Sequence, residues 1–229
     1  MTPERYLTLS TALARRQPDL TVLADNVHKP HNVAALMRSC DAVGVFEIHA
    51  VGGAATSKRA VGISGGTAPW VKVRRYTAIR EAAAELKANN YQIVAAHFSD
   101  TAVDYRLPDY TRPTALLLGA ELYGVSDEAV ALADLHAVLP MRGLVASLNV
   151  SVAAALFLYE AARQREAAGM YTTCRLPPAL YADTLFEWCY PEIAALCRAK
   201  SVAYPPLSSE GELGANPFIG SGTGAGRAP

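Results

Sequence analysis

The chain has 229 residues, of which 51% are hydrophobic and 18% are charged, and its 21 basic and 21 acidic side chains cancel. A chain of this length buries roughly 70% of its unfolded surface, so it can build a substantial core. It holds no apolar run of about 18 residues that would cross a membrane, and its first residues lack the apolar centre of a secretory signal. We therefore expect a soluble protein of the cytoplasm with no membrane partner.

The cysteines and histidines predict no metal site. The four cysteines are Cys40, Cys174, Cys189 and Cys197. They form neither a CxxC pair nor a zinc-binding spacing, and a single core of this size does not need disulfides. His28 and His31 lie three residues apart with no further ligand nearby. We expect free thiols and no bound metal.

Positive charge gathers toward the amino-terminal end of the chain. Residues 1–80 hold 11 Lys and Arg against 5 Asp and Glu, residues 81–160 hold 4 against 10, and residues 161–229 hold 6 against 6. A basic first third is compatible with phosphate binding, and an ordinary solvated surface explains it equally well. Charge alone therefore leaves a nucleic-acid partner open.

The predicted elements alternate between helices and strands. A first helix has Thr2 as its cap and Pro3 in its first turn, and it ends near residue 16. After it we predict a strand at 20–24, a helix within 27–44, a strand at 45–51, a glycine-rich loop at 52–69, a strand at 71–73, a helix capped by Thr77, strands at 91–96 and 114–118, a helix capped by Ser126, a strand at 135–139 and a helix at about 147–165. Beyond Gly169, prolines separate short helices, and the Gly-, Pro- and Ser-rich end predicts disorder.

Strands separated by helices predict βαβ units. The fold class is therefore α/β, with a mostly parallel sheet and helices on both faces. Within the helix at 27–44 the apolar residues recur at helical spacing, at Val33, Leu36, Met37, Cys40 and Val43. Arg38 points to the opposite side of that helix, so its face is either solvated or turned toward a partner.

Three motifs common in α/β proteins are absent or incomplete. The turn after the first strand, DNVHKPHN, contains no glycine, which excludes a Rossmann dinucleotide site. Gly119 and Gly124 have P-loop spacing, but Val125 stands where the lysine belongs. Residues 62–66, GISGG, match the GxSxG of hydrolases, yet they follow a poor strand and precede Pro69, which opposes the required helix. Nucleotide-binding and hydrolase functions are therefore disfavoured.

Three blocks of the sequence resemble motifs one, two and three of the SPOUT superfamily of RNA methyltransferases. They are VHKPHNVAALMRSCDAVG at 27–44, LLLGAELYGVSDEAVALAD at 116–134 and LPMRGLVASLNVSVAAALFLYEAARQ at 139–164. Within the superfamily the chain is most similar to the TrmH family of tRNA guanosine 2′-O-methyltransferases. The resemblance extends to about residue 200.

The resemblance implies features that periodicity does not show. It implies a parallel α/β domain whose carboxy-terminal portion is threaded into a deep trefoil knot, with S-adenosylmethionine bound in the knot and active sites at the interface of a homodimer. Positions matching Ala96, Leu139 and Leu148 contact the cofactor in the family. We add Leu118 and Gly119, because ligands of open α/β sheets bind at the carboxyl ends of strands. Each leucine also suits plain core packing.

Catalysis requires a ribose 2′-hydroxyl to attack a sulfonium methyl in line and to lose its proton. By resemblance Arg38 is the central catalytic residue, and Asn32, Glu121, Ser147 and Asn149 complete the site. Asn32 is predicted as the N-cap of its helix, and Ser147 and Asn149 start the last core helix, where positive helix ends favour phosphate. Glu121 suits a structural partner of a buried donor equally well. Because a guanidinium stays protonated, we expect Arg38 to grip a phosphate and orient the ribose.

The implied substrate is the D-loop guanosine at position 18 of tRNA. Methylation of ribosomal RNA is the first alternative, and a non-catalytic RNA-binding protein is the second. The predicted regions are an N-terminal helical extension at 1–17, the SPOUT catalytic domain at 18–165, a C-terminal helical extension at 166–202 and a disordered tail at 203–229. We expect the two extensions to hold the tRNA.

Overall fold

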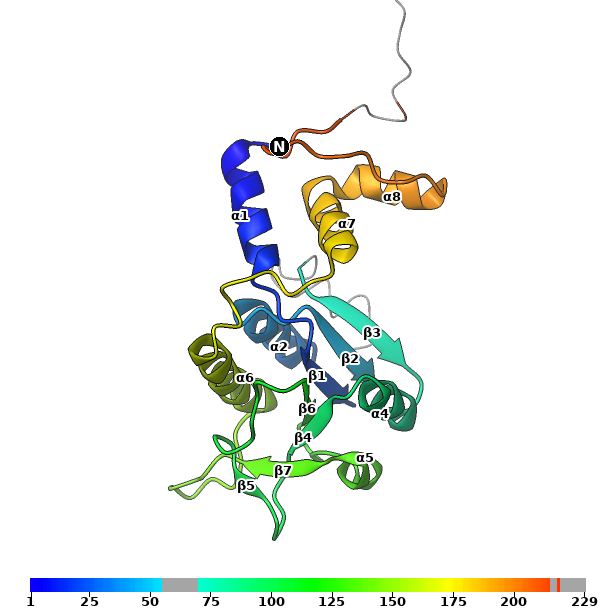
Figure 1. The fold of residues 1–229 in the computed structure, drawn as a ribbon. Coiled ribbons are helices and arrows are strands. Elements are labelled where there is room, and N and C mark those ends of the chain that lie inside the picture. The colour runs from blue at the N-terminus through cyan, green and yellow to red at the C-terminus, as the bar shows by residue number, and fades with distance from the viewer. Residues whose placement is uncertain (55–69, 215–217, 219–229) are drawn as a thin grey trace, which may run out of the picture. The chain divides into compact units, whose positions relative to one another are not determined.

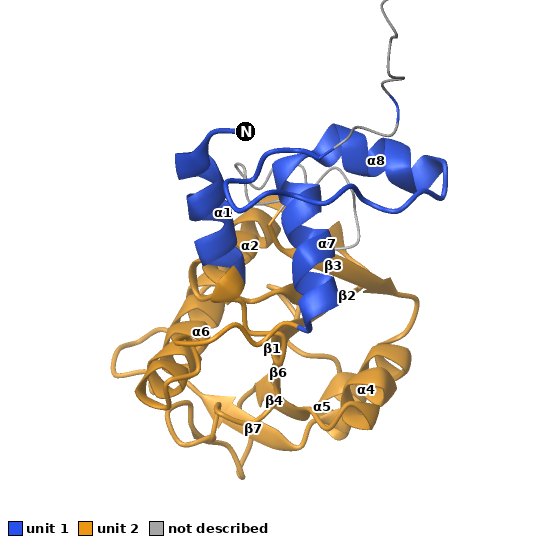
Figure 2. Cartoon of the chain, turned by 45° about the horizontal axis from the view of Figure 1, so that its top comes forward, with its two compact units in different colours: residues 1–13, 177–229 blue, residues 14–176 orange. Residues whose placement is uncertain are grey.

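The chain forms two compact units, which we describe separately (Figure 2). The computed structural model describes residues 1–54, 70–214 and 218. One unit comprises residues 14–176, and the other comprises residues 1–13 with the segment that begins at residue 177. Residues 1–13 and 177–202 of the two predicted extensions lie in the smaller unit, whereas residues 14–17 and 166–176 of them lie in the larger one. The GISGG segment lies outside the described residues.

The larger unit is built on a parallel sheet of seven strands (Figure 1). The strand order is β3-β2-β1-β6-β4-β7-β5, and all six neighbouring pairs are parallel. The strands are β1 (Leu20–Asp25), β2 (Glu47–Val51), β3 (Lys72–Tyr76), β4 (Gln92–Ala96), β5 (Val103–Asp104), β6 (Thr114–Leu118) and β7 (Leu135–Val138). The α/β class with a parallel sheet is therefore confirmed, and only the two-residue β5 was not predicted.

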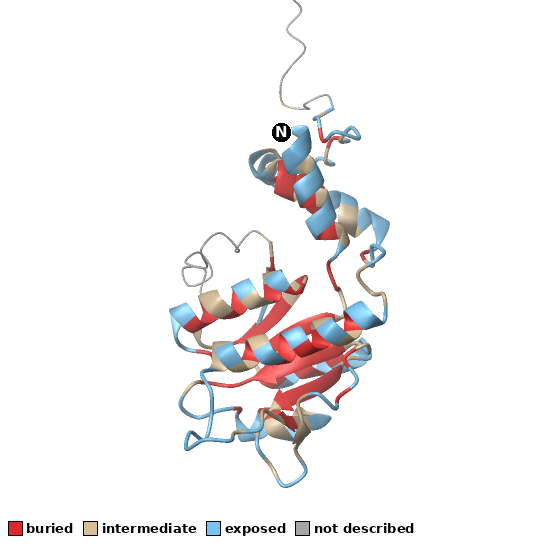
Figure 3. Cartoon of the chain, turned by 90° about the vertical axis from the view of Figure 1, so that its left-hand side faces the viewer, coloured by how far each residue is buried: buried red, intermediate tan, exposed pale blue. Residues whose placement is uncertain are grey.

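Helices cover both faces of the sheet, each over its own core. The helices of this unit are α2 (Pro30–Ala42), α4 (Ile79–Ala88), α5 (Asp127–Leu132) and α6 (Val150–Ala167). Residues of β1 alternate between the two cores: Leu20 and Val22 pack with α2 and α6, while Leu23 packs with α4 and α5. This is the two-residue period of a strand buried on both faces. Figure 3, turned toward the α2 and α6 side, shows that these helices are buried on the side that faces the sheet and exposed on the other side.

The apolar stripe predicted for α2 is confirmed. Val33, Leu36, Met37 and Cys40 are buried, and Arg38 is exposed. The helix begins with Pro30, whose missing N–H costs nothing in a first turn, and the chain turns at Gly44 with φ +82°. A Cβ on Gly44 would lie 2.8 Å from the carbonyl oxygen of Arg15, so a side chain does not fit there.

Two predicted helix caps are wrong, two are right, and one helix starts slightly later than predicted. The Thr2 hydroxyl accepts from the Arg5 amide at 3.3 Å, as expected of the cap of the first helix. Lys29, and not Asn32, is the N-cap of α2, because Pro30 opens that helix earlier. Ala78 takes the place predicted for Thr77, which instead bonds Glu81. The last long helix starts three residues after Ser147, with Asn149 as its cap. Ser126 caps α5 as predicted, and its side chain accepts from the Ala129 amide.

The carboxyl end of α6 is tied down by a buried arginine. The Arg165 side chain is fully buried. Its Nη1 donates to Asp19 Oδ1 at 2.6 Å, and its Nε donates to the Tyr110 carbonyl at 2.8 Å. Its Nη2 donates to the carbonyls of Asp19 and Arg112. Arg175 adds a second ion pair to Asp19 at 2.6 Å. We call Arg165, Asp19 and Arg175 the clasp, since they join three distant segments.

The smaller unit contains three helices and an ordered turn. Its helices are α1 (Pro3–Ala14), most of which belongs to it, α7 (Pro178–Cys189) and α8 (Pro191–Ala199). After α8 the Tyr204 ring stacks on Phe186 at 4.7 Å, and the Tyr190 hydroxyl donates to the Gly211 carbonyl at 2.9 Å. The expectation of disorder from residue 203 therefore differs from the structure up to residue 214, because aromatic contacts hold this segment. Residues 215–217 and 219–229 lie outside the described residues.

Within the described part of the chain, no helix combines the length and the hydropathy needed to span a bilayer. No three His, Cys, Asp or Glu side chains among those residues lie together as metal ligands.

Candidate active site

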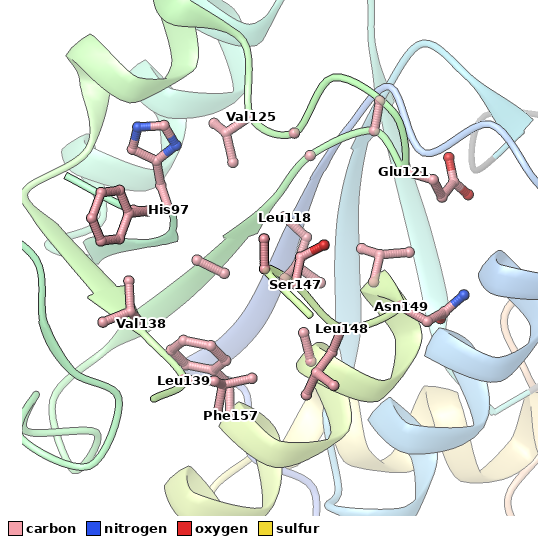
Figure 4. A pocket seen from close by; sticks show the side chains of 18 of the residues that line it. His97, Leu118, Glu121, Val125, Val138, Leu139, Ser147, Leu148, Asn149 and Phe157 are labelled. Carbon is pink, nitrogen blue, oxygen red and sulfur yellow. The ribbon is translucent and has the colours of Figure 1, made fainter. Parts of the chain in front are cut away.

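A cavity of about 900 Å³ opens where β4, β6 and β7 end (Figure 4). Ligands of parallel α/β sheets bind at this edge, just beyond the carboxyl ends of the strands. All five residues expected to bind the cofactor line the cavity: Ala96, Leu118, Gly119, Leu139 and Leu148. Ser147, Glu121 and Asn149 line it as well. The structure therefore brings together residues from the end of β4 and from the second and third motif blocks.

The apolar part of the cavity is shaped by a close backbone approach. A Cβ on Gly119 would lie 2.0 Å from the carbonyl carbon of Gly124, so no side chain fits at position 119. The amide of Ala120 donates to the Gly124 carbonyl at 2.8 Å, and the Gly124 amide donates back to Ala120 at 2.8 Å. Gly124 itself has φ +70°. Residues 120–124 are thus a tight, doubly bonded turn at the cavity rim, which we call the rim turn.

The polar part is a network that joins the three motif blocks. Glu121 Oε1 accepts from Asn32 Nδ2 at 2.7 Å and from the Lys29 amide at 3.0 Å, and its Oε2 accepts from the His28 amide at 3.2 Å. Asn32 Oδ1 then accepts from Asn149 Nδ2 at 3.1 Å. Asn149 Oδ1 caps α6 through the Ser151 amide at 2.9 Å. One chain of hydrogen bonds therefore connects the starts of α2 and α6 to the rim turn.

The network keeps the Glu121 carboxylate ionised. Burial by itself raises the pKa of this carboxyl. Hydrogen bonds from the Asn32 side chain and from backbone amides outweigh burial and lower the pKa to about 2. A carboxylate at the amino end of α2 is also favoured by the helix dipole. The positive end of α2, expected to suit an external phosphate, is therefore occupied by the chain's own Glu121.

Arg38 lies apart from this network. It is exposed on α2 and does not line the cavity. Within the described residues, it forms no hydrogen bond or ion pair, and so its guanidinium donors remain available. A single chain therefore brings Asn32, Glu121, Ser147 and Asn149 to the cavity or to its polar network. It does not bring Arg38 there.

Several lining residues were not predicted from the sequence. They include Lys29, His97, Phe98, Leu122 and Tyr123. His97 and Phe98 directly follow the end of β4, so their position after a buried strand is a usable signal. Leu122 and Tyr123 gave no periodic signal, because they belong to a turn.

The chain is similar to known proteins along most of its length. The profile of the SpoU rRNA Methylase family matches residues 19–159, and the profile for the C-terminal part of SpoU rRNA methylases matches residues 163–216. The tRNA (guanosine(18)-2′-O)-methyltransferase of Escherichia coli K12 is 49% identical over 218 residues, which make up 94% of this chain and 95% of the relative.

Two solved structures are also similar to this chain. The A. aeolicus TrmH/SpoU tRNA modifying enzyme superposes with a TM-score of 0.76 at 42% identity, covering 82% of this chain and 96% of that one. The AdoMet-bound rRNA methyltransferase of Sinorhizobium meliloti superposes with a TM-score of 0.58 at 30% identity, covering 65% of this chain and 61% of that one.

Proposed function

The chain belongs to the SpoU methylase family, and on that premise we propose that it methylates the 2′-hydroxyl of guanosine 18 in tRNA with S-adenosylmethionine. The observation that carries this function is the 49% identity to a tRNA (guanosine(18)-2′-O)-methyltransferase along nearly the whole of both chains. The site supports it, because an apolar cavity and a polar network meet at the edge where α/β sheets bind ligands.

The cavity fits the chemistry of S-adenosylmethionine, which joins an apolar purine to a polar amino acid. Leu118, Leu139 and Leu148 would provide apolar contacts for the adenine, and the backbone at Ala96 and Gly119, which lines the same cavity, would bond its edge. The missing side chain at Gly119 lets the backbone of Gly124 come close, which shapes the cavity at this point. The cofactor, when bound, supplies an electrophilic methyl group on sulfur. The role of the chain is to hold and orient it.

Glu121 acts by positioning other groups. Its ionised carboxylate accepts three hydrogen bonds and thereby fixes Asn32 against Asn149. This favours the structural reading of Glu121 over direct chemistry on the substrate. Asn32 and Asn149 hold the cavity wall in register, and the Ser147 hydroxyl faces the cavity to bond RNA or cofactor (Figure 4).

Arg38 binds the phosphate of the target nucleotide and orients its ribose. Its guanidinium is exposed, and a guanidinium offers a planar fork of donors and no acceptor, which suits phosphate binding and opposes a role as base. The proton of the 2′-hydroxyl then leaves to that phosphate or to water. This role accounts for a charged side chain opposite the apolar stripe of α2.

The protein works as a homodimer, because a single chain does not bring Arg38 to its own cavity. α2 packs against α6. The outward side of α6 carries Val152, Leu156 and Tyr159, all exposed at spacings of four and three residues. A second copy that covers this apolar stripe would place Arg38 of one chain near the cavity of the other. The site is then complete only in the dimer.

The chain forms the trefoil knot that the family implies, and contacts at the end of α6 support this part of the proposal. Gln164 Nε2 donates to the carbonyls of Arg106 at 3.3 Å and Pro108 at 3.2 Å, and Arg165 Nε donates to the Tyr110 carbonyl. The connection from β5 to β6 therefore lies against the end of α6. The smaller unit, with α1, α7 and α8, binds the body of the tRNA.

The function is tested by transfer of labelled methyl groups from S-adenosylmethionine to an unmodified tRNA transcript. Nuclease digestion identifies the modified nucleoside, which we expect to be 2′-O-methylguanosine from position 18. Transfer to ribosomal RNA alone would instead support the first alternative, methylation of ribosomal RNA. No transfer and no cofactor binding would favour the non-catalytic RNA-binding protein.

The same assay tests the role of Arg38. Arg38→Lys removes the planar fork but keeps a charge, so turnover should fall by about 100-fold or more, because misoriented reactants lose rate steeply. Cofactor binding, measured by equilibrium dialysis, should stay normal. Near-normal turnover of this variant would show that Arg38 takes no part in the reaction.

A further inference from the structure

The rim turn presents two large apolar side chains to solvent. Leu122 is 80% exposed and Tyr123 is 82% exposed, although both line the cavity. The Tyr123 hydroxyl has no hydrogen-bond partner among the described residues. Exposed aromatic side chains beside a pocket often mark a contact with a ligand or partner. The tip of the rim turn is therefore built to meet something outside this chain.

The rim turn is also rigid and coupled to the site. Two backbone hydrogen bonds of 2.8 Å close it between Ala120 and Gly124. Glu121, two residues before Tyr123, is held by three hydrogen bonds from the start of α2. A side chain on such a turn loses little backbone freedom when it binds, which favours its use as a platform. The segment at 140–149, which also reaches the rim, forms no helix or strand.

The chemistry of the substrate identifies the occupant. The 2′-hydroxyl and the base are attached to neighbouring carbons of one ribose. Placing the hydroxyl at the cavity therefore places the base within a few bonds of the rim. Every base offers a flat π-face, and aromatic side chains stack on such faces in proteins that bind unpaired nucleotides.

We propose that the Tyr123 ring stacks on the guanine base of the nucleotide to be methylated, with Leu122 extending the apolar platform. This inference rests on the proposed function and adds the residue that holds the target base. Tyr123 thereby fixes the base while Arg38 fixes the phosphate, and the ribose between them is oriented from both sides. Stacking on the base requires no charge on the Tyr123 or Leu122 side chain.

The test uses the full-length protein and two tRNA transcripts. One transcript is intact, and the other carries a ribose without a base at position 18. We expect Tyr123→Ala to raise KM for the intact transcript by about 5- to 150-fold, the range of one lost base stack. Tyr123→Phe and Tyr123→Trp keep an aromatic ring, so their KM should equal that of the wild type. Cofactor binding should be unchanged in all three variants. Leu107→Ala, which removes an exposed leucine that does not line the cavity, is the matched control.

The abasic transcript distinguishes a contact with the target base from other roles. Wild type and Tyr123→Ala should show the same KM on it, because the base that Tyr123 contacts is missing. An equal penalty for Tyr123→Ala on both transcripts would overturn the inference. A smaller native mass of that variant would overturn it too, since the ring would then belong to the dimer interface. A wild-type protein that methylates neither transcript would instead overturn the proposed function, and the inference with it.

Discussion

The two ends of α6 both carry polar networks, but the networks differ in how completely they are closed. At the carboxyl end, the Arg165 side chain of the clasp is buried, and its Nε, Nη1 and Nη2 each donate to partners within the same chain. At the amino end, Asn149 continues into a network that borders the cavity, where the Ser147 side chain is exposed. A closed network stabilises the fold, whereas an open one has donors left for a ligand.

The largest effect is expected from breaking the closed network. Arg165→Met removes a buried guanidinium and leaves the carbonyls of Tyr110 and Arg112 without these donors. The free energy of unfolding should fall by about 3–5 kcal/mol, the usual cost of removing one partner of a buried ion pair. Thermal denaturation measures the loss, and methyl transfer at low temperature should persist.

Arg80→Met is the control for the clasp. Arg80 pairs with Glu128, and both of these side chains are exposed. Exposed ion pairs contribute little to stability, so the unfolding temperature should hardly move. Equal destabilisation by both variants would contradict the structural role of the clasp.

A smaller effect, on activity, is expected from breaking the open network. Asn32→Ala removes the Nδ2 that donates to Glu121 and the Oδ1 that accepts from Asn149. Turnover should fall by about 100-fold, because displacements near 1 Å at a site cost that much. The unfolding temperature should fall far less than for Arg165→Met. Asn89→Ala, at the exposed end of α4, is the control, and an equal loss of turnover there would contradict the prediction.

The smallest effect is a dependence of stability on pH. Hydrogen bonds hold the pKa of Glu121 at about 2 in the folded protein, well below the usual range of a glutamate. The stabilisation is therefore present above the unfolded pKa and is lost as the pH falls toward 2. Glu121→Gln should lower the unfolding temperature near neutral pH, and the difference from wild type should shrink between about pH 5 and about pH 2. A difference that stays constant with pH would disprove the link. Glu166→Gln, exposed on α6, provides the control.

Local patterns predicted the strands and helices well where burial dictates sequence. The buried stripe of α2 and the buried strands β4 and β6 consist mainly of apolar residues, so the period of each element is clear in the sequence. Helix starts were harder to predict. Asn32 and Thr77 are good caps by residue type, but Lys29 and Ala78 are the residues that occupy the cap positions. The strand β5 has two residues and no period at all.

The candidate site residues came from the resemblance and, for Leu118 and Gly119, from the predicted ends of strands. The five cofactor positions line one cavity, yet no local pattern shows that Glu121 bonds Asn32, 89 positions earlier in the chain. The exposure of Tyr123 depends on a turn whose closure depends on Gly124. Arg165 looks like a solvated charge near a helix end, and its burial depends on Asp19, which comes from the start of the sheet.

The clasp sets an order for folding during synthesis. Asp19 and Arg165 are 146 residues apart, so the carboxylate leaves the ribosome long before its partner. At translation rates of about 5–20 residues per second, Asp19 waits roughly 7–30 seconds for the arginine. This corner of the sheet stays open during that time, and it closes only when nearly the entire catalytic unit has been made.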